Sequence, residues 1–387
     1  MVSVQRFYFD HNATTPVAPE VLETMVACLG QVYGNASSIH HFGQSAKQRL
    51  EAARRQLASL IHAGAGEVVF ASGGTEADNL AVLGVVRAAG GRSSHVVTTA
   101  IEHPAVLGAV QQLEREGVAV TRVRTGASGV VNPDDIRNAL RPDTVLVSVM
   151  HANNELGTVQ PIAEIARVTR EAGIPLHADG VQALGKIPVD VDALGVDLYS
   201  MSGHKLYAPK GVGALYVRKG TRLAPIAHGG HHERDRRPGT ENVPGIAAFG
   251  AAAELSGRML AAEGGRLGML RDRLEAAVLE RIPGSGVNGS RWNRVPNTSN
   301  LYFDGIDGEA MVIALDLRGF AVSTGAACSS GAIAPSHVLT AIGLTADRAR
   351  ASMRFSLGRD NTAEQVDALA DAIGASVAHL RRISVHA

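Results

Sequence analysis

The sequence reads PLHADGVQALGK over residues 175–186 and YSMSGHKLYAPKG over residues 199–211. Each stretch begins with residues typical of a buried strand and continues into a turn that carries polar side chains. Binding sites of open parallel sheets gather where the strands end. Because Asp179 follows one strand and Lys205 follows another, we expect these two side chains to share a site.

The segments around these two stretches alternate between short apolar runs and runs of helical period. The expected strands are 67–72, 95–100, 144–150, 174–179, 196–202 and 213–218. Helical patterns lie between the first four of them. Strands separated by helices favour right-handed βαβ units in a largely parallel sheet. The pattern therefore predicts a large α/β domain over residues 15–256.

The C-terminal part has a different order of elements. Residues 256–281 form a long helical pattern, after which strands and helices follow in an α+β order. This order predicts a smaller second domain made of residues 1–14 and 257–387. The domain would carry a loop rich in glycine and serine at residues 323–335.

The composition excludes several classes of function. The chain has 387 residues, with 37 Lys and Arg against 37 Asp and Glu. A balanced charge gives no global attraction to nucleic acid or to an anionic membrane. The N-terminus lacks the features of a secretory signal, and no apolar run approaches the roughly 20 residues that span a bilayer. We therefore expect a cytoplasmic protein that binds neither nucleic acid nor membrane.

The two cysteines have different surroundings. Two are too few for a disulfide framework. Cys28 lies in an apolar, helix-like pattern, which predicts a buried and inert side chain. Cys328 lies in VSTGAACSSGAIAP, where small and polar neighbours offer little apolar cover. Cys328 is therefore the candidate for a reactive thiol.

Lys205 and Asp179 together suggest a particular cofactor. A lysine Schiff base needs an aldehyde, and pyridoxal phosphate also needs an acid beside its pyridine nitrogen. Either residue alone would more simply be a surface lysine or a helix cap. The pair therefore indicates a site for pyridoxal phosphate.

Two further features fit such a cofactor. In ASGGTEADN, residues 71–79, Gly74 and Thr75 open a helix whose N–H groups could bind a phosphate, although the glycines could serve only the turn. The segment lacks the glycine spacings of dinucleotide and triphosphate sites. His103 follows a strand and could stack on a flat ring, although a lone histidine is more often an ordinary hydrogen-bonded residue.

A set of segments resembles the cysteine desulfurases of the nitrogen-fixation and iron–sulfur-assembly type, which are class V aminotransferases of fold type I. The matching segments, between residues 10 and 359, are FDHNATTP, GNASSIH, SGGTEADN, IEHPAV, HANNELGTVQPI, HADGVQALGK, SGHKLYAPKGVG, RPGTENV, STGAACSSG and RFSLGR. The resemblance implies a large domain with a mainly parallel seven-stranded sheet flanked by helices, and a smaller α+β domain. Ala36 and Gly180 depart from the usual residues of the family without removing a functional group.

The resemblance also implies a role for each residue of the site. Lys205 would tether pyridoxal phosphate, His103 would stack on its ring, and Cys328 would receive sulfur; these are the expected catalytic residues. The expected cofactor-binding residues are Gly74, Thr75, His103, Asn154, Asp179, Gln182, Ser202, His204, Lys205 and Thr240. Among them, Gln182 would contact the phenolic oxygen of the ring. The expected residues for the substrate carboxylate are Asn12, Asn154 and Arg354. Thr240 would come from the second subunit of a homodimer.

The implied reaction converts L-cysteine to L-alanine and passes sulfur through a Cys328 persulfide to an acceptor protein, such as an iron–sulfur scaffold. A selenocysteine lyase and a class V aminotransferase are the alternatives. Transamination needs no thiol, so Cys328 argues against the aminotransferase. A binding protein without turnover is disfavoured by the complete set of Asp179, His103 and Lys205. We expect no metal site, because the histidine-rich segment 228–237 has the pattern of a polar loop.

Overall fold

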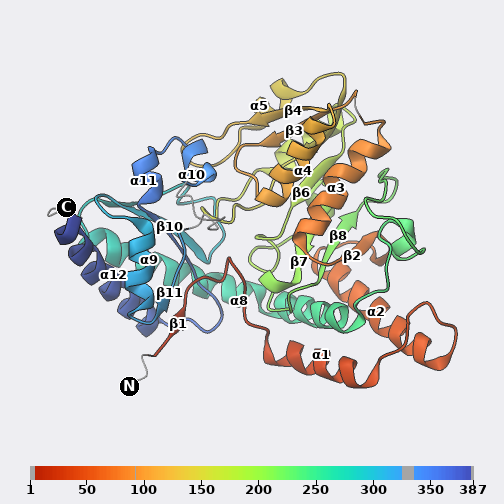
Figure 1. Ribbon diagram of the computed structural model, residues 1–387, viewed down its shortest axis with the longest axis horizontal. Helices are drawn as coiled ribbons and strands as arrows, with labels where there is room; N and C mark the ends of the chain where they lie inside the picture. The colour runs from red at the N-terminus through yellow and green to blue at the C-terminus, as the bar shows by residue number, and fades with distance from the viewer. Residues whose placement is uncertain (1–4, 92, 325–334, 385–387) are drawn as a thin grey trace.

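The computed structural model describes residues 5–91, 93–324 and 335–384, which form three β-sheets and the helices that cover them (Figure 1). The largest sheet has seven strands. Their spatial order is β2 (Val68–Ala71), β8 (Gly213–Val217), β7 (Leu198–Ser202), β6 (Leu176–Asp179), β5 (Thr144–Ser148), β3 (His95–Thr99) and β4 (Ala119–Val123). Only β8 runs against the other six, pairing antiparallel with β2 and β7. The mainly parallel seven-stranded sheet is thus confirmed.

The two faces of this sheet follow from the alternation of side chains along each strand. On β7, Leu198 packs with α3 (Gly74–Ala88) and α4 (Pro104–Arg115), whereas Tyr199 packs into the cluster that includes α2 (His41–Leu60) and α6 (Ile162–Glu171). On β6, Leu176 and Ala178 belong to the second cluster. The alternation therefore turns Asp179 toward the α3 face.

Strand β4 has no counterpart among the strands expected from the sequence. It lies at the edge of the sheet and pairs only with β3 within the described chain. Its side chains are mostly half-buried, and Arg122 is exposed. An edge strand needs less apolar sequence than a central one, so the periodicity of this segment is weak.

A second group of strands brings the start of the chain beside its C-terminal part. β12 (Ser352–Ser356), β10 (Thr298–Phe303) and β9 (Ser285–Val287) form an antiparallel sheet, and β1 (Phe7–Tyr8) pairs parallel with β11 (Phe320–Ala321). Helices α9 (Gly308–Asp316) and α12 (Ala363–Ser384) cover this group (Figure 1). The division into domains at residues 14 and 256 remains a prediction.

Helix α8 (Val243–Arg281) runs between these two parts of the molecule (Figure 1). Phe249 and Leu255 in its first half pack in the core of the large sheet, and Leu274 in its second half packs beside the small sheet. The helix begins earlier than the expected residue 256, because the side chain of Asn242 caps it by accepting from the Gly245 amide.

The remaining helices complete the described chain. They are α1 (Pro19–Gln31), α5 (Pro133–Ala139), α7 (Val191–Leu194), α10 (His337–Ala341) and α11 (Ala346–Arg350), with 3₁₀ turns at Ala65–Glu67, Gly203–Lys205 and Glu233–Asp235. Among the helices of the described residues, none combines the length and the apolar character needed to cross a membrane.

Candidate active site

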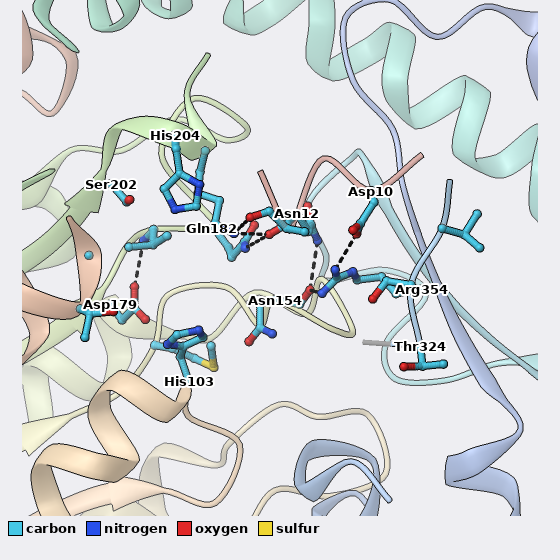
Figure 2. A pocket seen from close by; sticks show the side chains of 18 of the residues that line it. Asp10, Asn12, His103, Asn154, Asp179, Gln182, Ser202, His204, Thr324 and Arg354 are labelled. Carbon is cyan, nitrogen blue, oxygen red and sulfur yellow. Dashed lines mark hydrogen bonds and ion pairs between the residues drawn. The ribbon is translucent and has the colours of Figure 1, made fainter. Parts of the chain in front are cut away.

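A cavity of about 720 Å³ lies where the strands of the large sheet end and the small sheet begins. Figure 2 shows Asp179, His103, Ser202 and His204 on one side of it and Arg354 with Asp10 on the other. The predicted site residues that line the cavity are Asn12, Gly74, Thr75, His103, Asn154, Asp179, Gln182, Ser202, His204, Lys205 and Arg354. The structure thus brings together segments that lie far apart in the sequence.

One further predicted site residue, Thr240, is not among those that line the cavity. Thr240 is exposed, and its predicted role across a subunit interface stays a prediction. Cys328 lies outside the described residues, although Ser323 and Thr324, which precede its segment, line the cavity. Cys28 is buried in α1, and burial raises the pKa of its thiol. The prediction that Cys28 is buried is confirmed.

Asp179 is a buried carboxyl at the end of β6. Its Oδ1 accepts from the backbone N–H of Val181 at 2.9 Å. Burial raises the pKa of the Asp179 carboxyl, while His103 and Lys205 act in the opposite direction. A buried carboxyl with few partners can share a proton with a basic ring nitrogen placed beside it.

His103 precedes the first turn of α4 and caps that helix. Its Nδ1 accepts from the backbone N–H of Ala105 at 3.1 Å, so the proton of the neutral ring belongs on Nε2. Burial lowers the pKa of His103. The ring is therefore a neutral, flat surface at the cavity wall.

Lys205 ends the 3₁₀ turn that follows β7. Its Nζ donates to the backbone oxygens of Asn12 and Ala13. Burial and the nearby Arg354 lower the pKa of Lys205 to about 8. A lysine with such a pKa supplies a substantial fraction of free amine near neutral pH, which both a nucleophile and a general base require.

Arg354 carries the positive charge at the opposite wall. Its Nη2 forms an ion pair with Asp10 Oδ1 at 2.7 Å, and its Nη1 donates to the backbone oxygen of Asn154 at 3.1 Å. The Nε group is buried and has no hydrogen-bond partner within the described chain. A planar guanidinium with a spare donor suits the binding of a carboxylate.

The turn between β2 and α3 comes very close to the end of β7. A Cβ on Gly74 would lie 3.4 Å from Ser202 Cβ at the end of β7 and 2.8 Å from Val181 Cγ2 in the turn after β6, so a larger residue would not fit here. The buried Oγ of Ser202 has no hydrogen-bond partner among the described residues. Together with Thr75 and the helix N-terminus, these donors suit a phosphate group.

Asn12 is held by protein groups on every side of its amide. Its Nδ2 donates to the Asn154 backbone oxygen at 3.1 Å and to Thr298 Oγ1 at 2.9 Å. Its Oδ1 accepts from Lys186 Nζ at 2.8 Å and from Asn297 Nδ2 at 3.2 Å. Both N–H groups are used within the protein, so these contacts hold Asn12 in place. The expected contact of Asn12 with a substrate carboxylate stays a prediction.

The sequence did not single out Asp10, Asp78 or Lys186. Asp10 neutralises Arg354, and Lys186 holds Asn12. Asp78 lines the cavity from α3, and its buried Oδ1 has no hydrogen-bond partner within the described chain, although His177 Nε2 lies 3.6 Å from it. Burial and Asp179 raise the pKa of Asp78 well above its usual range. Each of these three residues lies within four positions of a predicted site residue. This proximity in sequence is the one feature that could have pointed to them.

Comparison with known proteins agrees with this geometry. The aminotransferase class-V family matches residues 7–369. The chain is 46% identical over 377 residues to cysteine desulfurase IscS of Dictyoglomus turgidum, covering 97% of this chain and 96% of that protein. It is 49% identical over 380 residues to cysteine desulfurase IscS of Anaeromyxobacter dehalogenans, covering 97% and 94%.

Solved structures give the same result. A NifS-like protein matches with a TM-score of 0.91 and 35% identity, covering 97% of this chain and all of the other. A NifS-like protein from Rickettsia africae matches with a TM-score of 0.86 and 31% identity, covering 96% and 99%. The chain therefore belongs to the aminotransferase class-V family. Within that family its relatives place it among the cysteine desulfurases.

Proposed function

We propose that the protein is a pyridoxal-phosphate-dependent cysteine desulfurase, which converts L-cysteine to L-alanine and transfers the sulfur to Cys328. The observation that carries the proposal is the meeting of Lys205, Asp179, His103 and Arg354 in one cavity. They provide a free amine, a buried acid, a flat neutral ring and a carboxylate-binding cation, which this reaction uses together.

The donors around the cavity fit pyridoxal phosphate. The unpartnered hydroxyl of Ser202 and the close approach at Gly74 support a phosphate site, and Asp179 supports a place for the pyridine nitrogen. When bound, the cofactor supplies an electron-accepting ring that stabilises negative charge at the substrate Cα. His103 would limit the position of the ring, because it covers one wall of the cavity.

The residues of the chain would handle substrate binding and proton transfer. Arg354 would bind the substrate carboxylate, with Asn154 at its side. Lys205 would tether the cofactor and then move the proton between the substrate Cα and solvent, which its pKa of about 8 allows. Asp179 would hold a proton at the pyridine nitrogen.

The sulfur transfer requires a thiolate that attacks the substrate sulfur. The new S–S bond forms as the substrate C–S bond breaks. The electron pair of the C–S bond remains on the substrate Cβ, which gains a proton and becomes the methyl group of alanine. Cys328 is then left as a persulfide, which a protein such as an iron–sulfur scaffold could accept. The position of Ser323 and Thr324 at the cavity supports Cys328 as this thiol.

We infer a homodimer to which Thr240 contributes across the interface. One observation in its favour is a set of large apolar side chains that are exposed on and after α1, namely Leu22, Val26, Leu29, Tyr33, Ile39 and Phe42. Grouped apolar side chains on a surface are typical of an interface. The segment before Thr240 is also firmly held, because Glu233 forms a buried ion pair with Arg54 at 2.7 Å.

The function is tested by incubating the holoenzyme with L-cysteine and a candidate scaffold protein. Alanine, sulfide and protein-bound persulfide are measured in the same samples. Equal amounts of alanine and transferred sulfur are expected. A keto acid in place of alanine would identify an aminotransferase, and turnover of L-selenocysteine alone would identify a selenocysteine lyase.

Asp179→Asn is expected to lower the rate of alanine formation by about 10²–10⁴-fold, the usual contribution of a positioned acid or base. The amide cannot keep the pyridine nitrogen protonated, whereas the phosphate donors remain intact. Cofactor affinity, measured by absorbance titration, should change much less. Near-normal turnover in a variant that still binds the cofactor would contradict the role of Asp179.

The capture of pyridoxal phosphate by the cofactor-free protein should depend on pH. Only the neutral amine of Lys205 reacts with an aldehyde, so the rate should rise as pH passes through about 8 and level off above it. Stopped-flow absorbance between pH 6 and about 10 measures the profile. A midpoint close to the ordinary pKa of lysine would contradict the conclusion that burial lowers the pKa of Lys205.

A further inference from the structure

Lys186 lies behind the cavity and is not one of the residues that line it. It stands four residues after Gln182, which lines the cavity directly. The Lys186 Nζ donates to Gln182 Oε1 at 2.5 Å and to Asn12 Oδ1 at 2.8 Å. The amine thus joins two side chains of the candidate active site.

These contacts determine how the Gln182 amide is turned. The oxygen and nitrogen ends of a glutamine amide have nearly the same shape, so hydrogen bonds decide between its two orientations. Oε1 accepts from Lys186, and Nε2 donates one N–H to the Asn12 backbone oxygen at 3.0 Å. The second N–H of Gln182 is therefore left for the cavity.

Asn12 connects Lys186 with Lys205. The backbone oxygen of Asn12 accepts from both Gln182 and Lys205, while its side-chain oxygen accepts from Lys186. Moving the Lys186 amine would therefore disturb Asn12, whose backbone oxygen accepts a hydrogen bond from the Lys205 amine.

We propose that Lys186 is a positioning residue that keeps an N–H of Gln182 directed at the ring oxygen of the cofactor and holds Asn12 in place beside Lys205. The inference rests on the proposed function for the identity of the ring. Lys186 itself touches neither cofactor nor substrate in this arrangement.

The charges around Lys186 agree with this role. Burial lowers the pKa of Lys186 well below its usual range, and the nearby Lys205 and Arg354 lower it further. Lys186 also interacts with His11, whose pKa of about 4 leaves it neutral. The Lys186 amine donates to two oxygen acceptors, Gln182 Oε1 and Asn12 Oδ1, so its contacts hold both side chains.

The test follows the visible absorbance of the holoenzyme as a function of pH. Lys186→Met removes the N–H groups while keeping a side chain of similar length, and Lys210→Met removes an exposed lysine nearby as the control. Lys186→Met should raise the pH at which half of the absorbance change has occurred. The shift should correspond to at least a threefold change in proton affinity relative to the wild-type protein. The reason is that a ring oxygen without its N–H partner holds its negative charge less well. Lys210→Met should leave the midpoint unchanged.

A double-variant comparison tests whether Lys186 acts through Gln182. Gln182→Leu should raise the midpoint in the same direction, and combining it with Lys186→Met should raise it no further. Additive shifts, or an unchanged midpoint in a folded Lys186→Met protein, would overturn the inference. If Lys186→Met does not fold, Lys186→Gln is used in its place, because it keeps an N–H donor group on a shorter side chain. Additive shifts of this variant with Gln182→Leu would again overturn the inference.

The outcomes separate this inference from the proposed function. A wild-type protein that binds the cofactor but makes no alanine from L-cysteine contradicts the function, yet its absorbance midpoints still test Lys186. Normal desulfuration with an unmoved midpoint in Lys186→Met contradicts the positioning role alone. If the protein shows no visible absorbance band after the cofactor is added, both the proposed function and the positioning role of Lys186 are contradicted.

Discussion

Lys205→Ala is expected to abolish the conversion of L-cysteine to alanine, with a loss of about 10⁴-fold or more, because one side chain serves as both the cofactor tether and the base. Its position supports both roles, since the amine lies in the cavity with Asp179 and Arg354 and has a pKa of about 8. The measurement is alanine formation under saturating L-cysteine and pyridoxal phosphate.

The assignment of Lys205 has a direct chemical check. Borohydride reduction of the wild-type holoenzyme, followed by peptide mass analysis, should find the cofactor on Lys205. Lys210→Ala is the matched control, because Lys210 is an exposed lysine of the same segment and should tolerate the change. Finding the cofactor on Lys186 or Lys210 would overturn the assignment.

Cys328→Ser is expected to bind cofactor and L-cysteine normally while forming almost no persulfide and almost no alanine. A serine hydroxyl is a far weaker nucleophile toward sulfur than a thiolate, so the C–S bond of the substrate remains intact. The measurements are alanine in solution and persulfide on the protein, with substrate binding followed by the change in visible absorbance.

Cys28→Ser is the control for this experiment. Cys28 is buried in α1, and burial raises the pKa of its thiol, so it should play no part in sulfur transfer. Its replacement should leave the rate of alanine formation unchanged. If Cys28→Ser lost activity while Cys328→Ser kept it, the wrong thiol would have been chosen.

Strands that are buried were predicted from the sequence more accurately than strands that are partly exposed. The runs that became β6 and β7 are buried along their whole length, which makes their apolar pattern easy to recognise. The edge strand β4 is largely half-buried and was missed for that reason. The start of α8 was also missed, because it depends on the cap at Asn242 and on packing against α1 and α2.

The candidate site divides in a similar way. The strand-end rule brought Asp179 and Lys205 together, and the resemblance supplied the wider set of residues. Neither could indicate that both N–H groups of the Asn12 amide are used, since its partner Thr298 is 286 positions away. Asp10 was overlooked for the same reason, because its partner Arg354 is 344 positions away.

The sequence by itself determined the class of fold, the family and the chemical groups of the site, because these depend on local periodicity and on short segments with particular side chains. Only the tertiary structure decided how those groups are oriented. Arg354 meets Asp10, and Lys186 turns the Gln182 amide through contacts that include Asn12. Hydrogen bonds and ion pairs depend on distances of a few ångströms between segments whose separation along the chain carries no such information.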